Sequence, residues 1–120
     1  MFEKKVPIYL QLIDVFKQSI IKQDWPADTY IASVRDLAIE YQVNPNTVFK
    51  ALSELERMNL LINDRTIGKK VTNDQDLILK TKKDMLEFAV SEFLEKLTSI
   101  GLNKSEALEA LHQAKEKRHD

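Results

Sequence analysis

Apolar residues recur at three- and four-residue steps near the start of the chain, and Pro7 stands where a helix can begin. The repeating positions are Tyr9, Leu12, Ile13, Phe16 and Ile20. This spacing predicts an amphipathic helix from Ile8 to about Gln23. The helix should end there because Trp25 precedes Pro26, and the residue before a proline is pushed away from the helical region.

Two shorter helices are predicted next, each with its own capping signal. Ser33, with Asp36 three residues later, can cap the first, while Asn44 followed by Pro45 is typical of the start of the second. The buried stripes would hold Val34, Leu37, Ala38 and Tyr41 in the first helix and Val48, Ala51, Leu52 and Leu55 in the second. Since only two or three residues separate these helices, they must cross at a steep angle.

A short hairpin should follow the third helix. The runs 60–63 and 69–72 are separated by a break at 64–68 that contains Gly68, which is the pattern of two strands joined by a turn.

Helical spacing returns from Asp76 to about Ile100, and Gly101 can end that helix in the left-handed conformation. A last helix is predicted from Asn103, with Glu106 completing its cap. The chain is therefore expected to be mostly α-helical with a small β-hairpin, divided into residues 1–72 and a two-helix tail, 73–120.

Residues 33–57 fit the helix-turn-helix template at several positions. Ala38 supplies the small residue at which the first helix abuts the second, and apolar side chains occupy the expected offsets from it. Gln42 stands at the turn, where glycine is usual, so its backbone must accept a left-handed or strained conformation. With the hairpin as a wing, the pattern predicts a winged helix-turn-helix.

Such a fold presents one helix to the major groove of DNA, which is wide enough to admit it. The candidate contacts on and before that helix are Asn44, Asn46, Thr47 and Lys50. Asparagine can bond adenine, lysine can reach guanine or phosphate, and threonine can serve a phosphate or a thymine methyl group. Ser33 and Arg35 are placed for a phosphate, and Arg65, Lys69 and Lys70 would contact DNA from the hairpin.

Each of these assignments competes with a purely structural interpretation. Arg35 could pair with an acidic neighbour on its own helix, such as Glu40, and capping is the favoured role for Asn44. Phe49 is interpreted mainly as a residue that packs over the wing, with contact to a thymine methyl group as the alternative. Lys69 and Lys70 could serve only to keep an edge strand soluble.

Three sequence runs resemble the DNA-binding domain of the GntR family of bacterial repressors: Ser33-Val34-Arg35-Asp36-Leu37-Ala38, Val43-Asn44-Pro45-Asn46-Thr47-Val48, and Leu52 to Glu56 with the hairpin after it. The opening 7–12, Pro-Ile-Tyr-Leu-Gln-Leu, is also typical of that family, and the short helical tail resembles its YtrA-like branch. The resemblance implies DNA contacts by Arg35, the start of the recognition helix and the wing tip. It also implies regulation of neighbouring transporter genes.

The chain departs from the family pattern in two places. Ile31-Ala32 precedes the serine where Leu-Pro is usual, and the wing 66–71 reads Thr-Ile-Gly-Lys-Lys-Val, in which only Gly68 and Val71 match a Gly-x-Gly-Thr-Phe-Val pattern. The wing tip is therefore expected to be more basic and less tightly turned than in the family.

The tail carries more apolar surface than its short last helix can cover. The residues expected to form an interface are Leu86, Val90, Phe93, Leu97 and Ile100. They could pack against the winged domain, but a two-fold partner is the better interpretation because a palindromic operator needs two recognition helices about 34–36 Å apart. We therefore expect a homodimer.

Composition narrows the function without choosing it. The net charge of −1 splits into +1 over 1–72 and −2 over 73–120, so bulk charge neither favours nor excludes DNA. With no cysteine, signal-peptide pattern or membrane span, the chain is expected to be cytoplasmic and to have no membrane partner.

No catalytic set is visible in the sequence. His112 and His119, near Glu109 and Glu116, do not form a three-ligand cluster, so we expect no metal, no cofactor and no enzymatic activity. The expected partners are double-stranded DNA and a second copy of the chain, with room for an unidentified small-molecule effector. The competing hypothesis is a winged-helix module that binds proteins rather than DNA.

Overall fold

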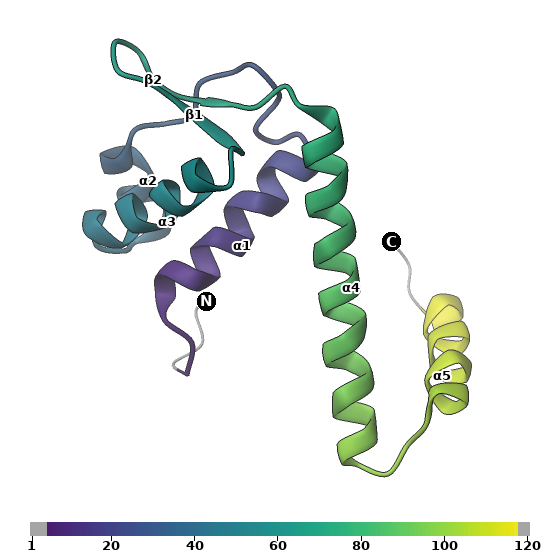
Figure 1. The fold of residues 1–120 in the computed structure, drawn as a ribbon. Helices are drawn as coiled ribbons and strands as arrows, with labels where there is room; N and C mark the ends of the chain where they lie inside the picture. The colour runs from purple at the N-terminus through teal and green to yellow at the C-terminus, as the bar shows by residue number, and fades with distance from the viewer. Residues whose placement is uncertain (1–4, 118–120) are drawn as a thin grey trace. The chain divides into compact units, whose positions relative to one another are not determined.

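The computed structural model describes residues 5–117, with side chains described to residue 114. Five helices and one two-stranded antiparallel sheet make up the described chain (Figure 1). In chain order they are α1 (Ile8–Ile21), α2 (Val34–Tyr41), α3 (Pro45–Arg57), β1 (Leu61–Asp64), β2 (Gly68–Val71), α4 (Gln75–Ser99) and α5 (Lys104–Lys117). The mostly α-helical class with a small hairpin is confirmed, and each predicted element lies within a few residues of its expected bounds.

The chain forms two compact units, the first ending at Lys82 and the second beginning at Lys83. The sequence placed the division after Thr72, before α4. The first unit reaches further because Leu77 and Ile78, in the first turn of α4, pack against the core of that unit.

The core of the first unit is built from the stripes that the apolar spacing predicts. Its helical members are Leu12, Ile13, Phe16, Ile20, Leu37, Ala38, Val48, Ala51, Leu52 and Leu55, and the hairpin and its approach add Leu60, Leu61 and Val71. The ring of Phe16 stacks on Trp25 with centroids 5.0 Å apart and meets the ring of Tyr41 edge-on at 5.7 Å. These aromatic pairs pack α1 against the α1–α2 connection, through Trp25, and against the last residue of α2, Tyr41.

Local capping determines where α2 and α3 begin. The Ser33 hydroxyl oxygen accepts a bond from the Asp36 amide at 3.1 Å, and the Asn44 side chain accepts one from the Asn46 amide at 2.7 Å. Between the helices, Gln42 adopts the left-handed conformation, with φ 55° and ψ 50°, as the helix-turn-helix pattern predicts. The caps and this turn therefore determine where α2 ends and α3 begins.

The hairpin is anchored to the chain before α2. The Ile31 amide donates to the Lys69 carbonyl at 2.9 Å, and the Val71 amide donates to the Thr29 carbonyl at 2.9 Å, so residues 29–31 run beside β2. At the tip, the Asp64 carboxylate accepts a bond from the Tyr30 hydroxyl at 3.1 Å and another from the Thr66 amide at 3.0 Å. The tip is thus held by a carboxylate that belongs to β1.

The second unit buries little of its own apolar surface. No side chain of α4 is buried, and Ala107 is the buried side chain between residues 83 and 114. Gly101 ends the α4 region with a φ of 84°, and Asn103 and Glu106 exchange hydrogen bonds that cap α5, both as predicted.

The left-handed residue at the turn gives a test of the fold. Gln42→Gly should raise the free energy of unfolding by about 0.5–1 kcal/mol, because glycine avoids the steric cost of this conformation but loses more entropy on folding. Chemical denaturation measures the change. The matched control is Gln18→Gly, at an exposed position inside α1, which should lower the free energy of unfolding by about 1 kcal/mol. Destabilisation by both variants would contradict the assigned turn.

The Asp64 carboxylate should titrate below its ordinary pKa. Its bond from the Thr66 amide is the main cause of the lowered pKa, and the Tyr30 hydroxyl adds to it. Because the pKa of Asp64 is lower in the folded chain than in the unfolded chain, the ionised carboxylate stabilises the fold. This contribution is fully present above pH 3.8, the ordinary pKa, and is lost as the pH falls through the lowered pKa of the folded chain. NMR titration should show the Asp64 pKa rising in Tyr30→Phe while staying below 3.8, and remaining unchanged in Tyr9→Phe. An identical Asp64 pKa in the wild type and Tyr30→Phe would refute the contact.

Candidate nucleic-acid interface

The face of α3 turned away from the core is polar apart from one aromatic residue. Burial of Val48, Ala51, Leu52 and Leu55 forces the intervening positions outward. Asn46, Phe49 and Lys50 are exposed in the first half of the helix, and Ser53 is half-buried one turn later. This is the surface that a winged helix-turn-helix offers to the major groove.

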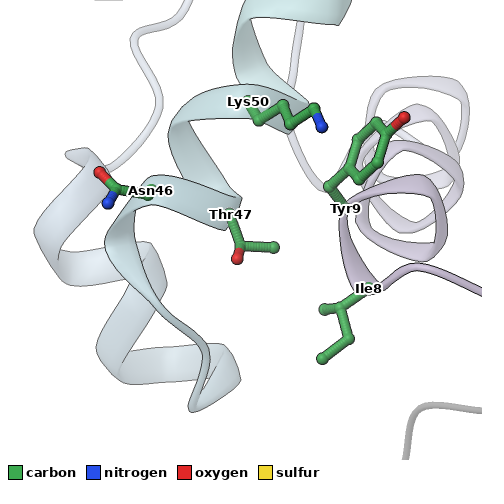
Figure 2. Close-up of a pocket in the computed structure, with 5 residues that line it drawn as sticks. All are labelled: Ile8, Tyr9, Asn46, Thr47 and Lys50. Atoms are coloured by element: carbon green, nitrogen blue, oxygen red, sulfur yellow. The ribbon is translucent and has the colours of Figure 1, made fainter. Parts of the chain in front are cut away.

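A hollow of about 370 Å³ lies between the first turns of α1 and α3, lined by Ile8, Tyr9, Asn46, Thr47 and Lys50 (Figure 2). The Lys50 ammonium lies 3.9 Å from the centroid of the Tyr9 ring, a cation–π contact that holds this charge on the α1 side of α3. The sequence analysis missed this role of Tyr9, which fits the apolar stripe of α1, because only the crossing of the two helices brings it to Lys50.

The residues predicted at the start of α2 are accessible. Ser33 and Arg35 are both exposed, although the Ser33 hydroxyl oxygen also serves as the helix cap. Arg35 takes part in none of the ion pairs found among residues 5–114, so the alternative pairing with Glu40 is absent from the structure. Its guanidinium group is left available to a ligand.

Two asparagines at the start of α3 have different surroundings. Asn44 is engaged as the N-cap, as the sequence analysis favoured, whereas the exposed side chain of Asn46 makes no hydrogen bond recorded for the described residues. Thr47 is half-buried beside the hollow. Asn46 is therefore the amide on α3 that is ready to meet a base edge.

The wing presents fewer available cations than its sequence suggests. The Lys69 ammonium lies 2.7 Å from a carboxylate oxygen of Glu56 on α3, and both side chains are largely buried, at 16% and 26% exposed. This ion pair ties β2 to α3 and competes with the DNA contact predicted for Lys69. Arg65, at the tip, is exposed, and Gly68 follows the turn with a φ of 144°.

Phe49 does not pack over the wing. Its side chain is 58% exposed, so the favoured packing interpretation is wrong. The Lys69–Glu56 ion pair joins α3 to β2 two turns nearer the C-terminus of α3. The exposure of Phe49 leaves the alternative interpretation, contact with a thymine methyl group, as a prediction.

Arg57, near the end of α3, is neutralised within its own helix. Its guanidinium group donates to the Glu54 carboxylate, and this bond lowers the pKa of Glu54 and raises that of Arg57. The charge available for DNA on α3 is therefore confined to its N-terminal half.

Among the described residues, no three His, Cys, Asp or Glu side chains are grouped so that they could hold a metal ion. His119, considered in the sequence analysis, lies outside those residues. None of the helices within residues 5–117 has the length and apolar character needed to span a bilayer.

Comparison with known proteins matches residues 8–71 to the gntR family of bacterial regulatory proteins. The transcriptional regulator YhcF of Bacillus subtilis is 32% identical, over 92% of this chain and 91% of its own. The repressor YtrA of the same organism is 31% identical, over 89% of this chain and 80% of its own. A GntR family regulator from Listeria monocytogenes superposes with a TM-score of 0.85 at 28% identity, covering 93% of this chain and 98% of the other.

These matches confirm the winged helix-turn-helix fold and the resemblance to the short YtrA-like branch. The similar proteins are regulators of transcription and not enzymes. The chain belongs to the gntR family of bacterial regulatory proteins and carries the DNA-binding domain of that family.

Proposed function

We propose that the protein is a transcriptional repressor that binds a palindromic DNA operator as a homodimer. The observation that carries the proposal is the exposed outer face of α3, where Asn46 makes no hydrogen bond found among the described residues and Lys50 is exposed. Residues 1–72 would form the DNA-binding domain and 73–120 the dimerisation tail.

In this proposal α3 enters the major groove with its N-terminal half against the bases. Asn46 reads a base edge and Thr47 contacts the backbone beside it, while Asn44 acts chiefly through its cap. Arg35 and Lys50 supply exposed cations, and Ser33 lies at the amide end of α2, where a phosphate is favoured. Arg65 extends the contact through the wing, where Gly68 lets the backbone approach the DNA closely. Lys69 would contact DNA only with an ammonium group that is also paired with Glu56.

The tail would form the interface with the second copy of the chain. Leu86, Val90, Phe93, Leu97 and Ile100 follow one another at alternating steps of four and three residues, the spacing of a helix–helix seam. Four of them are 38–66% exposed, and Leu97 is half-buried. The first four of the five residues lie on one stripe of α4, and Ile100 directly follows the helix. So much exposed apolar surface is costly in water, and pairing with the same residues of a second chain would bury it.

Repression is supported by the similarity to YtrA, whose name describes a repressor. The regulated genes would be transporter genes next to its own, and the site of action the cytoplasm, where such DNA lies. A small-molecule effector would act by changing the spacing of the two recognition helices.

The test is to titrate the purified protein onto promoter DNA of its own operon at two salt concentrations, with the mass in solution measured alongside. Tight, sequence-selective binding that weakens steeply with salt, by a particle of twice the 13.9 kDa chain mass, is expected. A monomer that ignores DNA would refute the proposal and favour a protein-binding module.

Single cation removals should locate the DNA face. Arg35→Ala and Lys50→Ala should each weaken operator binding about tenfold, because each removes a charged contact to DNA, while the dimer persists. Fluorescence anisotropy with labelled operator measures the loss. The control Lys22→Ala removes an exposed lysine at the C-terminal end of α1, whereas Lys50 contacts Tyr9 near the N-terminal end of that helix. This variant should leave the affinity unchanged. Unchanged affinity in both test variants would contradict the assignment.

A charge placed in the tail seam should separate the two copies. Val90→Glu should convert the dimer to a monomer and weaken operator binding by about a hundredfold or more, since each half-site must then be bound alone. Sedimentation velocity measures the oligomeric state. Ser91→Glu adds the same charge on the other side of α4 and should stay dimeric. A dimer in Val90→Glu would show that the interface lies elsewhere.

A further inference from the structure

Phe49 is the large apolar side chain that α3 leaves in solvent, at 58% exposed. A single exposed aromatic residue is common on protein surfaces and carries no argument by itself. The position of this one on the helix is what gives it a role.

Helical geometry places Phe49 at the edge of the exposed α3 face that is nearer the wing. It comes three residues after Asn46, so the two side chains are neighbours on the helix surface. It also comes seven residues before Glu56, hence on the same stripe as the residue that holds Lys69 of the wing. Lys50 marks the opposite edge of the face, where it contacts Tyr9.

Along α3, Phe49 has no exposed apolar neighbour that would extend it into a docking patch for a protein. Its outward neighbours on α3, Asn46 and Ser53, are polar, and the next exposed side chain along the helix is the charged Lys50. A protein interface would need several apolar residues around an aromatic anchor. A small apolar group set among hydrogen-bonding groups is the better match.

Resting on the proposed DNA-binding function, we propose that Phe49 is a specificity-determining residue that contacts a thymine C5-methyl group in each half-site. Thymine is the base that presents a methyl group in the major groove, and phenylalanine is suited to meet it. Asn46 beside it is suited to adenine. The two side chains together select A·T pairs opposite the first two turns of α3.

The experiment uses a duplex that the full-length protein selects from a random library, made once with thymine and once with deoxyuridine at every thymine of the half-sites. Deoxyuridine keeps the base pairing and removes only the methyl group. Wild-type protein should bind the deoxyuridine duplex about fourfold more weakly for each methyl contacted. Phe49→Ala should bind the thymine duplex as weakly as the wild type binds the deoxyuridine duplex. This variant should bind the two duplexes equally.

Controls separate the thymine contact from folding and from DNA binding itself. Phe49→Leu keeps an apolar side chain and should retain part of the preference for thymine, and Ile39→Ala, at a 67% exposed position on α2, should retain all of it. The thermal unfolding of Phe49→Ala should match the wild type.

Two results would overturn the thymine contact while leaving the proposed function intact. In one, the wild type and Phe49→Ala lose the same factor in affinity when deoxyuridine replaces thymine. In the other, the wild type loses no affinity. Absence of salt-dependent binding to either duplex by the wild type would overturn the proposed function and this inference with it.

Discussion

The packing of α3 against α1 is the constraint on which the rest of the molecule depends. An amphipathic helix can bury only one stripe of its side chains in a core. In α3 this stripe is Val48, Ala51, Leu52 and Leu55, which belong to the same buried cluster as Phe16. That choice leaves Asn46, Phe49 and Lys50 in solvent, in a fixed rotational position. The same burial that stabilises the first unit therefore determines which side chains can meet DNA, and a core substitution that rotated α3 would change its specificity.

The wing and the turn extend this constraint to the neighbours of α3. Gln42 accepts a left-handed backbone so that α2 can reverse into α3 over a few residues, and the Lys69–Glu56 ion pair fixes β2 to the far half of α3. A largely buried pair of this kind is costly to break by removing one partner, because the other charge would be left without compensation. The wing is thus fixed to α3, and in the proposed complex the docking of α3 on DNA would also place the wing.

Local signals in the sequence predicted the elements well, and contacts between long side chains poorly. Caps at Ser33 and Asn44 and the left-handed Gln42 depend on a few adjacent residues, so the sequence analysis found them. Lys69 and Lys50 could not be placed in this way, since their partners Glu56 and Tyr9 are 13 and 41 positions away and meet them only after the elements cross. Phe49 was also misjudged, because its exposure depends on where the wing lies relative to α3, which local spacing in the sequence does not determine.

The ion pairs reduce the number of cations that the first unit can offer to DNA. Glu54 and Glu56 neutralise Arg57 and Lys69. Of the cations predicted to contact DNA, Arg35, Lys50, Arg65 and Lys70 belong to no ion pair found among the described residues. Affinity for DNA rises with the number of phosphates neutralised, so these four cations give one subunit only a modest affinity. Two subunits that are fixed to each other double that number and make the second contact intramolecular. In the proposed dimer, the sparse charge of the first unit and the exposed apolar seam of α4 therefore have a common explanation, because a weakly basic DNA-binding domain is useful only when it is paired.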